Sequence, residues 1–183
     1  MPVSLKWAAG LVFTLVSALI AGEPQRGGRS GSTPAGRAPA PPPLVAAGKP
    51  FVTTGCDESL WAHVYRPTRL QVAARCIEVT GTIHHLKKES DGDDHIQLKV
   101  DSRFDMLLND RNRTVQAGCL VVEPVCENTV TQQDAISACK DFHATVNVGA
   151  KGRVKVLGAY VLDTEPNHGW TEIHPVTSIT AIP

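Results

Sequence analysis

The stretch QVAARCIEVTGTI, residues 71–83, decides the fold. Its apolar side chains Ile77, Val79 and Ile83 recur at alternate positions, with Gly81 in phase, and helix signals are few. A period of two is typical of a strand with one buried face, and a glycine inside a strand indicates a bend. We therefore predict a long first strand that bends at Gly81.

The residues after this strand predict four more. The turn residues 89–93 (ESDGD) are followed by alternating apolar residues at Ile96, Leu98 and Val100, a pattern that predicts a hairpin. Three further strands are predicted at residues 119–123, 153–162 and 170–179. The chain should therefore form a mainly β domain with five strands.

A short helix is predicted between the third and fourth strands, over residues 131–141. Thr131 stands three residues before Asp134, a variant of the capping box that opens helices. Three antiparallel strands, a helix and a closing hairpin give the order of a five-stranded, OB-like barrel, which binds oligonucleotides or oligosaccharides in other proteins. A β-sandwich is the competing architecture, but five strong strands and an inserted helix fit a barrel better.

The first fifty residues differ in composition from the rest. Residues 1–22 combine one basic residue, Lys6, with an apolar run and small residues, which is the layout of a secretory signal peptide. An uncleaved anchor is the alternative, but about 14 apolar residues fall short of the roughly 20 that span a bilayer. Residues 23–50 are rich in proline and glycine and contain no aromatic residue, so we expect a disordered linker before a domain at 51–183. A secreted or periplasmic protein with no stable membrane span follows.

The charge and the cysteines narrow the function classes. From Cys56 to Pro183 the chain has 13 Lys or Arg residues and 17 Asp or Glu residues, a formal net charge of −4, which argues against nucleic acid as a partner. In an exported chain, disulfides are the default state of cysteine. We predict two bridges, Cys56–Cys76 and Cys126–Cys139, which leave Cys119 as a buried thiol in an apolar stretch.

Four strings carry a resemblance to a known group. They are VTGTI (79–83), DGDDHI (91–96), GAYVLD (158–163) and WTEIHPV (170–176). They resemble small secreted bacterial proteins of unknown function with an OB-like barrel, over about residues 56–182. The resemblance implies the fold and an exported location, and it implies no activity.

One polar constellation could carry chemistry. His95, His174, Glu172 and Asp93 are candidate ligands for a divalent metal ion, with Glu172 or Asp94 as a candidate catalytic base for phosphodiester or ester hydrolysis. The competing interpretation is structural. Asp-Gly-Asp is ordinary turn sequence, and the two histidines can be partly buried imidazoles that bond to carboxylates. Alternation places His95 on the face away from the core.

A binding surface is the second candidate site. Trp61, Tyr65 and Trp170 could stack on sugars or bases. The competing interpretation, which is favoured for Trp170, is that such rings fill or cover the open ends of a small barrel. Common enzyme signatures such as GxSxG and HExxH are absent from the sequence. We therefore expect a non-enzymatic exported binding module for an envelope glycan, a peptide or a protein partner, with a metal-dependent, nuclease-like hydrolase as the alternative.

Overall fold

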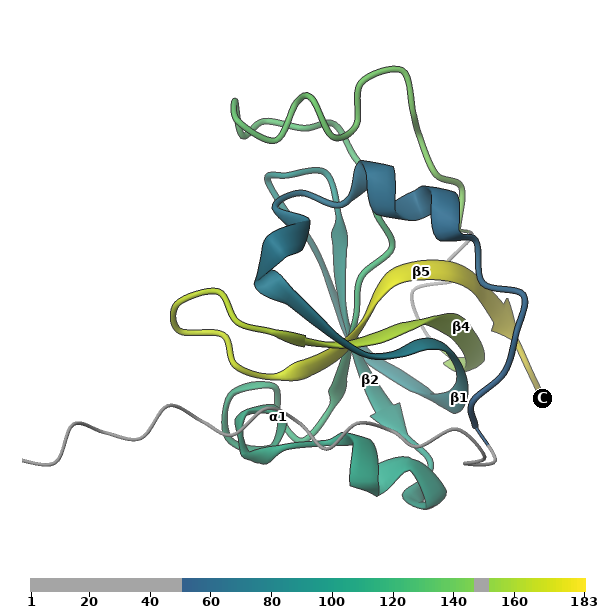
Figure 1. Cartoon of the computed structure of the whole chain (residues 1–183). Coiled ribbons are helices and arrows are strands. Elements are labelled where there is room, and N and C mark those ends of the chain that lie inside the picture. Colours follow the sequence, from purple (N-terminus) through teal and green to yellow (C-terminus); the bar gives the residue numbers. More distant parts are fainter. Residues whose placement is uncertain (1–50, 147–151) are drawn as a thin grey trace, which may run out of the picture. The chain divides into compact units, whose positions relative to one another are not determined.

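The computed structural model describes residues 51–146 and 152–183 (Figure 1). The predicted signal peptide, residues 1–22, and the predicted linker, residues 23–50, lie outside the described residues. Among the described residues, no helix is both long and apolar enough to cross a membrane.

Five strands form one mixed sheet whose hydrogen bonding closes into a ring, in the order β1-β2-β3-β5-β4 (Figure 1). The strands are β1 (Leu70–Lys88), β2 (Asp94–Val100), β3 (Leu120–Val122), β4 (Gly152–Asp163) and β5 (Thr171–Ala181). Strand β1 pairs with both β2 and β4, which closes the ring, and only the β3–β5 pairing among these strands is parallel. The prediction of a mainly β domain with five strands is confirmed.

The interior of the ring is apolar, as the period of two requires. Every strand contributes to one buried cluster, with Ile77 from β1, Leu98 from β2, Leu120 from β3, Val156 from β4 and Ile173 from β5 among its members. These side chains are nearly or completely inaccessible to solvent. The residues between them in the sequence therefore point to the outside of the ring.

Two glycines allow neighbouring strands to approach closely. A Cβ atom on Gly81 would lie 2.8 Å from Cα of Val100, and one on Gly158 would lie 2.6 Å from the carbonyl oxygen of Pro175. Both distances are shorter than real Cβ contacts. The register of the β4–β5 pairing also shifts on either side of Gly158. Glycine is thus required where β1 and β4 pass their neighbours.

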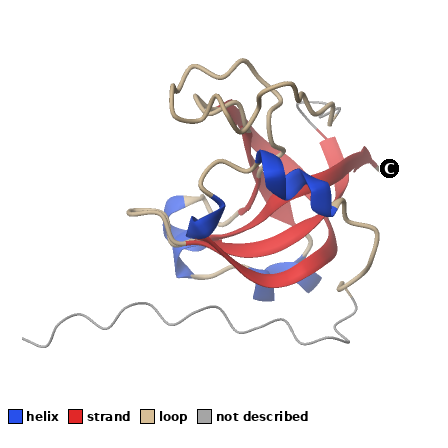
Figure 2. Cartoon of the chain, turned by 45° about the horizontal axis from the view of Figure 1, so that its top comes forward, coloured by secondary structure: helices blue, strands red, loops and turns tan. Residues whose placement is uncertain are grey.

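Short helices lie outside the ring (Figure 2). They are the 3₁₀ helices η1 (Glu58–His63), η2 (Pro67–Arg69) and η3 (Ser102–Leu107), and the α-helix α1 (Asp110–Val115). The predicted helix at 131–141 is wrong, because those residues form turns. The α-helix lies instead between β2 and β3, where the side chain of Asn109 accepts from the backbone of Asn112 in a capping box.

Contacts with distant residues explain why residues 131–141 do not continue as a helix. The backbone N–H groups of Thr131 and Gln132 both donate to the carbonyl oxygen of Ser90. Asp134, the expected capping residue, instead accepts a hydrogen bond from the hydroxyl of Tyr65. The capping signal was present in the sequence, but these residues use their polar groups to contact other segments.

Both predicted disulfides, Cys56–Cys76 and Cys126–Cys139, are confirmed. The second lies in the segment after β3, which we call the cap segment (residues 124–146). A second apolar cluster lies on the outside of β4. It combines Leu60 of η1, Val125 of the cap segment and Val161 of β4. Cys119 is a buried free thiol, as predicted, and burial raises its pKa.

Candidate functional site

A group of charged side chains is buried between the outer face of the ring and the segments that cover it. We call this group the buried polar cluster, and its members are Arg69, Asp93, His95, Glu123, Asp163, Glu172 and His174. Charged groups are rarely buried unless they are paired. Each member of the cluster is therefore expected to have a charged or hydrogen-bonding partner.

Alternation along β5 places two members side by side. Ile173 points into the ring, so Glu172 and His174 point outwards, and each has a relative exposure of 0%. The parallel pairing of Val121 with Glu172 brings the end of β3, and hence Glu123, next to them. Asp93 arrives from the turn before β2, where its Oδ1 accepts from the backbone N–H of Cys126 in the cap segment at 2.9 Å.

His174 lies at the centre of the buried polar cluster. Its Nδ1 is 3.0 Å from Oε2 of Glu123 and 3.1 Å from Oε1 of Glu172. Burial alone would lower the pKa of His174, but the hydrogen bonds with Glu123 and Glu172 outweigh it and raise the pKa to about 10. The imidazole is therefore a cation at neutral pH.

Glu123 joins two histidines. Its second oxygen, Oε1, is 2.7 Å from Nδ1 of His95. Burial alone would raise the pKa of Glu123, but the hydrogen bonds from His174 and His95 lower it well below the ordinary value. The same contact, against the opposing effect of burial, raises the pKa of His95 to about 9. Nε2 of His95 bonds to Oε1 of Gln116 at 3.1 Å.

Arg69 balances the remaining carboxylates. Its guanidinium donates to Asp163 and lies 3.9 Å from both Glu123 and Glu172. Burial and the charge of Glu123 raise the pKa of Glu172. The indole N–H of Trp170 donates to the other oxygen of Glu172 at 2.9 Å. The cluster therefore satisfies most of its charge internally.

Two buried side-chain atoms in the described part of the chain have no hydrogen-bond partner, Oδ2 of Asp93 and Nε2 of His174. They face each other at 3.6 Å. Burial raises the pKa of Asp93 to about 7, even though the charge of His174 opposes this.

The structure brings together four predicted site residues, His95, His174, Glu172 and Asp93, which all belong to the buried polar cluster. Asp94, a predicted catalytic candidate, is not a member, because its carboxylate accepts from Nδ2 of Asn128 at 2.7 Å. The orientation expected for His95 is found, although its side chain is largely covered.

Sequence reasoning missed Arg69, Glu123 and Asp163. Glu123 directly follows the apolar residues 119–122 and precedes Pro124. A charged residue at the end of so buried a segment could have indicated an internal partner. Arg69 is the last residue of η2, directly before β1, and Asp163 is the last residue of β4. No local pattern distinguishes either residue from the solvated end of an element.

The predicted aromatic surface is not assembled as one face. Trp170 is buried, and its ring stacks on His168 with the centroids 4.2 Å apart. Trp61 packs against the apolar residues beneath the cap segment. Tyr65 uses its hydroxyl on Asp134. These rings therefore contribute mainly to packing.

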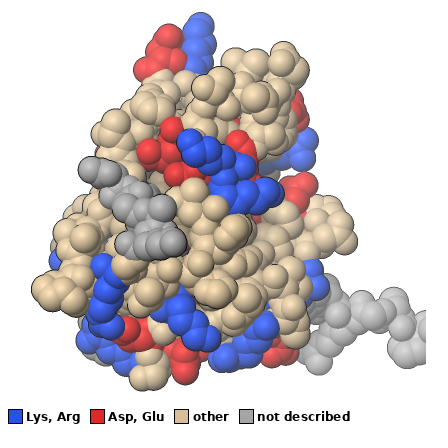
Figure 3. All heavy atoms as spheres, turned by 180° about the vertical axis from the view of Figure 1, so that it is seen from behind, with Lys and Arg blue, Asp and Glu red and all other residues tan. Residues whose placement is uncertain are grey.

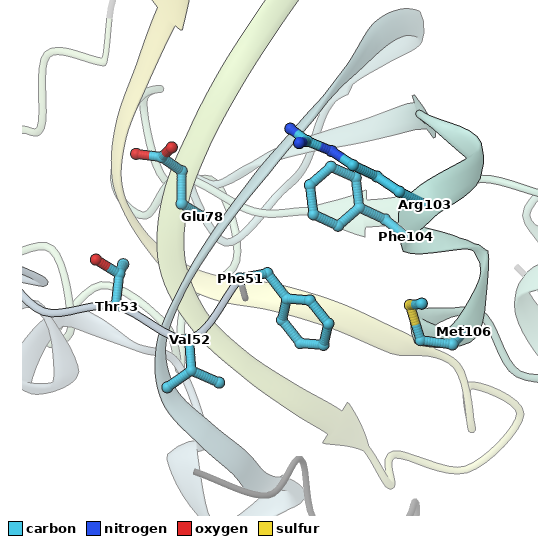
Figure 4. Close-up of a pocket in the computed structure, with 7 residues that line it drawn as sticks. All are labelled: Phe51, Val52, Thr53, Glu78, Arg103, Phe104 and Met106. Atoms are coloured by element: carbon cyan, nitrogen blue, oxygen red, sulfur yellow. The ribbon is translucent and has the colours of Figure 1, made fainter. Parts of the chain in front are cut away.

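A pocket of about 350 Å³ lies away from the buried polar cluster (Figure 4). Its lining residues are Phe51, Val52, Thr53, Glu78, Arg103, Phe104 and Met106. Figure 4 shows Phe51 between a wall that carries Glu78 and an opposite wall, on η3, that carries Arg103 and Met106. The side of the molecule in Figure 3 shows basic and acidic side chains interspersed, without a continuous basic track.

Residues 58–163 match the family described as viral coat protein P2 C-terminal domain. No curated protein and no solved structure matches the chain. The expected resemblance to secreted bacterial proteins is therefore corrected, because the family that matches is viral.

Proposed function

Because this chain belongs to the family of viral coat protein P2 C-terminal domains, we propose that it is a non-enzymatic structural module that associates with a second copy of itself through the pocket beside η3. The observation that carries this proposal is the exposed Met106 next to a hollow that Phe51 and Phe104 line, with opposite charges on its two walls. The family supports a structural or binding role for the chain.

The geometry of the buried polar cluster favours a structural role over hydrolysis. A general base must come within hydrogen-bond reach of its substrate. Glu172 and His174 have no exposed surface and already contact each other and Glu123. A substrate would have to displace the covering segments to reach them.

The location and the finer fold belong to the same proposal. Two disulfides support maturation in an oxidising compartment, which agrees with an exported chain. The closed strand order and the parallel β3–β5 pairing support an OB-like barrel. A protein partner is favoured over a glycan, because Trp170 is buried and Trp61 and Tyr65 already contact other parts of the domain.

The pocket has the features of a self-complementary contact. In a two-fold dimer every contact between one residue of the first copy and another residue of the second is also made with the two copies exchanged. Met106 has a relative exposure of 62% and stands beside a hollow that Phe51 and Phe104 line. A two-fold axis through the pocket would insert Met106 of each copy into the hollow of the other.

Charge complementarity supports the same arrangement. Arg103 lies over the ring of Phe104, 4.6 Å from its centroid, and forms no ion pair among the described residues. Within residues 51–146 and 152–183, the one ion pair of Glu78 is with Lys155 at 3.3 Å, and both side chains are nearly half exposed. The same two-fold axis would bring Arg103 of one copy opposite Glu78 of the other.

The test is the mass of the full chain in solution, by sedimentation equilibrium over a wide concentration range. We expect a monomer–dimer equilibrium that Met106→Glu weakens by about tenfold or more, since loss of a hot-spot contact at the centre of an interface costs about 2 kcal/mol or more, and about 1.4 kcal/mol corresponds to tenfold. Ile136→Glu is the matched control, because Ile136 is also exposed, at 44%, but lies in the cap segment. A monomer at all concentrations, or equal effects of the two variants, would overturn the proposal.

A charge exchange sharpens the test. Glu78→Arg and Arg103→Glu should each weaken the dimer, and the double variant should recover part of the lost affinity. Additive weakening in the double variant would show that the two side chains do not meet across an interface.

A further inference from the structure

Two buried polar atoms face each other in the buried polar cluster without a hydrogen bond. Oδ2 of Asp93 and Nε2 of His174 belong to residues with relative exposures of 3% and 0%, and neither atom has a partner in the described part of the chain. Their separation of 3.6 Å exceeds the usual hydrogen-bond range. Unsatisfied polar groups at such depth are costly, so their arrangement needs a reason.

Both side chains are held in place by contacts at their other polar atoms. Nδ1 of His174 lies 3.0 Å from Glu123 and 3.1 Å from Glu172. Oδ1 of Asp93 accepts from the backbone N–H of Cys126. Histidines that bind metals almost always have a carboxylate or carbonyl partner on the second ring nitrogen, which orients the ring. Glu123 and Glu172 occupy that position here.

The separation suits a cation between the two atoms. Typical Zn–N and Zn–O distances of about 2.0–2.2 Å place two tetrahedral ligands about 3.4 Å apart. Asp93, His174 and Glu123 each have a possible ligand atom within 4.8 Å of the others, and Glu123 lies on the Nδ1 side of the His174 ring, where it can orient the ring. Asp91, whose Oδ1 accepts from the backbone N–H of Asp93, offers a further carboxylate on the same turn.

Two other groups of metal-binding residue types are less suitable. In the group of Asp93, Cys126 and Cys139, both sulfurs belong to a disulfide. In the group of Glu89, His95 and Glu123, both ring nitrogens of His95 already have partners. The pair of Asp93 and His174 is the one with free donor atoms that point at each other.

We propose that Asp93 and His174 bind a divalent transition-metal cation of the Zn²⁺ type, with Glu123 and Glu172 as the carboxylates that orient His174. The lone pair of Nε2 binds the cation, and the proton on that nitrogen is released to solvent. The cation would connect the turn before β2 to strand β5. This site does not depend on the self-association proposed above, since it shares no residue with the pocket.

The test is Zn²⁺ binding by the oxidised full chain, measured by equilibrium dialysis with metal analysis and by calorimetry. We expect one Zn²⁺ per chain. Loss of an orienting partner typically weakens metal binding by about 10- to 100-fold. Asp93→Asn removes a ligand and should weaken Zn²⁺ binding by more than that. Asp94→Asn is the matched control, because Asp94 is the next residue and is also buried but bonds to Asn128. It should leave the affinity unchanged.

A second measurement covers the case in which Asp93→Asn does not fold. In the wild-type chain, Zn²⁺ should shift the NMR resonance of Nε2 of His174 and leave that of Nε2 of His95 in place. No stoichiometric binding, undiminished binding in Asp93→Asn, or a Zn²⁺-dependent shift at His95 alone would each overturn the proposal.

Discussion

Replacement of Arg69 by methionine tests the energetics of the buried polar cluster. The guanidinium is the cation shared by Asp163, Glu123 and Glu172, and all three carboxylates are at most 8% exposed. Methionine preserves most of the apolar stem and removes the charge. Loss of one partner from a buried ion pair typically costs about 3–5 kcal/mol, because the remaining charge is left uncompensated. For a domain of this size such a loss lowers Tm by roughly 10–20 °C.

Arg153→Met is the matched control for this prediction. Arg153 pairs with Asp101 at 2.6 Å, but both side chains are partly exposed, so the pair should contribute only about 0–1 kcal/mol. Urea unfolding at pH 8 and pH 5 gives both free energies of unfolding. The loss for Arg69→Met should be smaller at pH 5, because protonation removes part of the uncompensated negative charge. If the two variants differ by less than about 1 kcal/mol at pH 8, Arg69 does not balance the carboxylates.

Two further predictions concern the pH dependence of stability and the packing of the ring. Because contacts with carboxylates outweigh burial and raise the pKa of His174 to about 10 from 6.5, the stability that its proton contributes is complete below pH 6.5 and is lost as the pH rises towards 10. Burial raises the pKa of Asp93 from 3.8 to about 7, so the stability that its proton contributes is lost between these two values and adds little to the change above pH 7. Calorimetry should therefore give a Tm that falls from pH 6.5 to pH 10 because of His174, and a constant or rising Tm would contradict this. Gly158→Ala should lower the free energy of unfolding by about 1–3 kcal/mol, since the new methyl group would overlap Ile173, and an unchanged urea midpoint would show that β4 and β5 can separate.

The strands could be predicted because one physical rule, alternation, applies to each of them. The rule also explains where the prediction stopped short. Residues 71–83 were expected as the first strand, but β1 continues to Lys88. The register of its pairing with β2 shifts between Ile83 and His85, which breaks the period of two. The residues beyond are polar and exposed except for Leu86, which packs against the core. A single apolar residue among polar ones is too weak a pattern to extend the predicted strand.

The two helical segments show how local signals are overridden. Thr131 and Asp134 form a reasonable cap, but the contacts of this region with Ser90 and Tyr65 use the same polar groups. Helix α1 has little apolar periodicity, and its one buried residue is Asn112. That side chain donates to backbone carbonyls of Cys119 and Thr171, so tertiary contacts rather than an apolar face hold the helix.

Alternation also explains how far the candidate site could be predicted. It placed Glu172 and His174 on one face, and the structure agrees. It could not indicate that this face is covered, because the cap segment has no periodic pattern from which packing could be inferred. Arg69 and Glu123 reach the same place only through the pairing of strands distant in sequence, which a local pattern cannot supply.

The buried polar cluster also bears on how the covering segments are positioned. Apolar contacts of Leu60, Val125 and Val161 favour burial of the cap segment but are non-directional. Hydrogen bonds are directional, and the bond from the N–H of Cys126 to Asp93 fixes one residue of the cap segment at one carboxylate. A slip by one residue would leave that carboxylate without its donor at a buried position. The cluster therefore selects one position for the cap segment at the cost of burying charge.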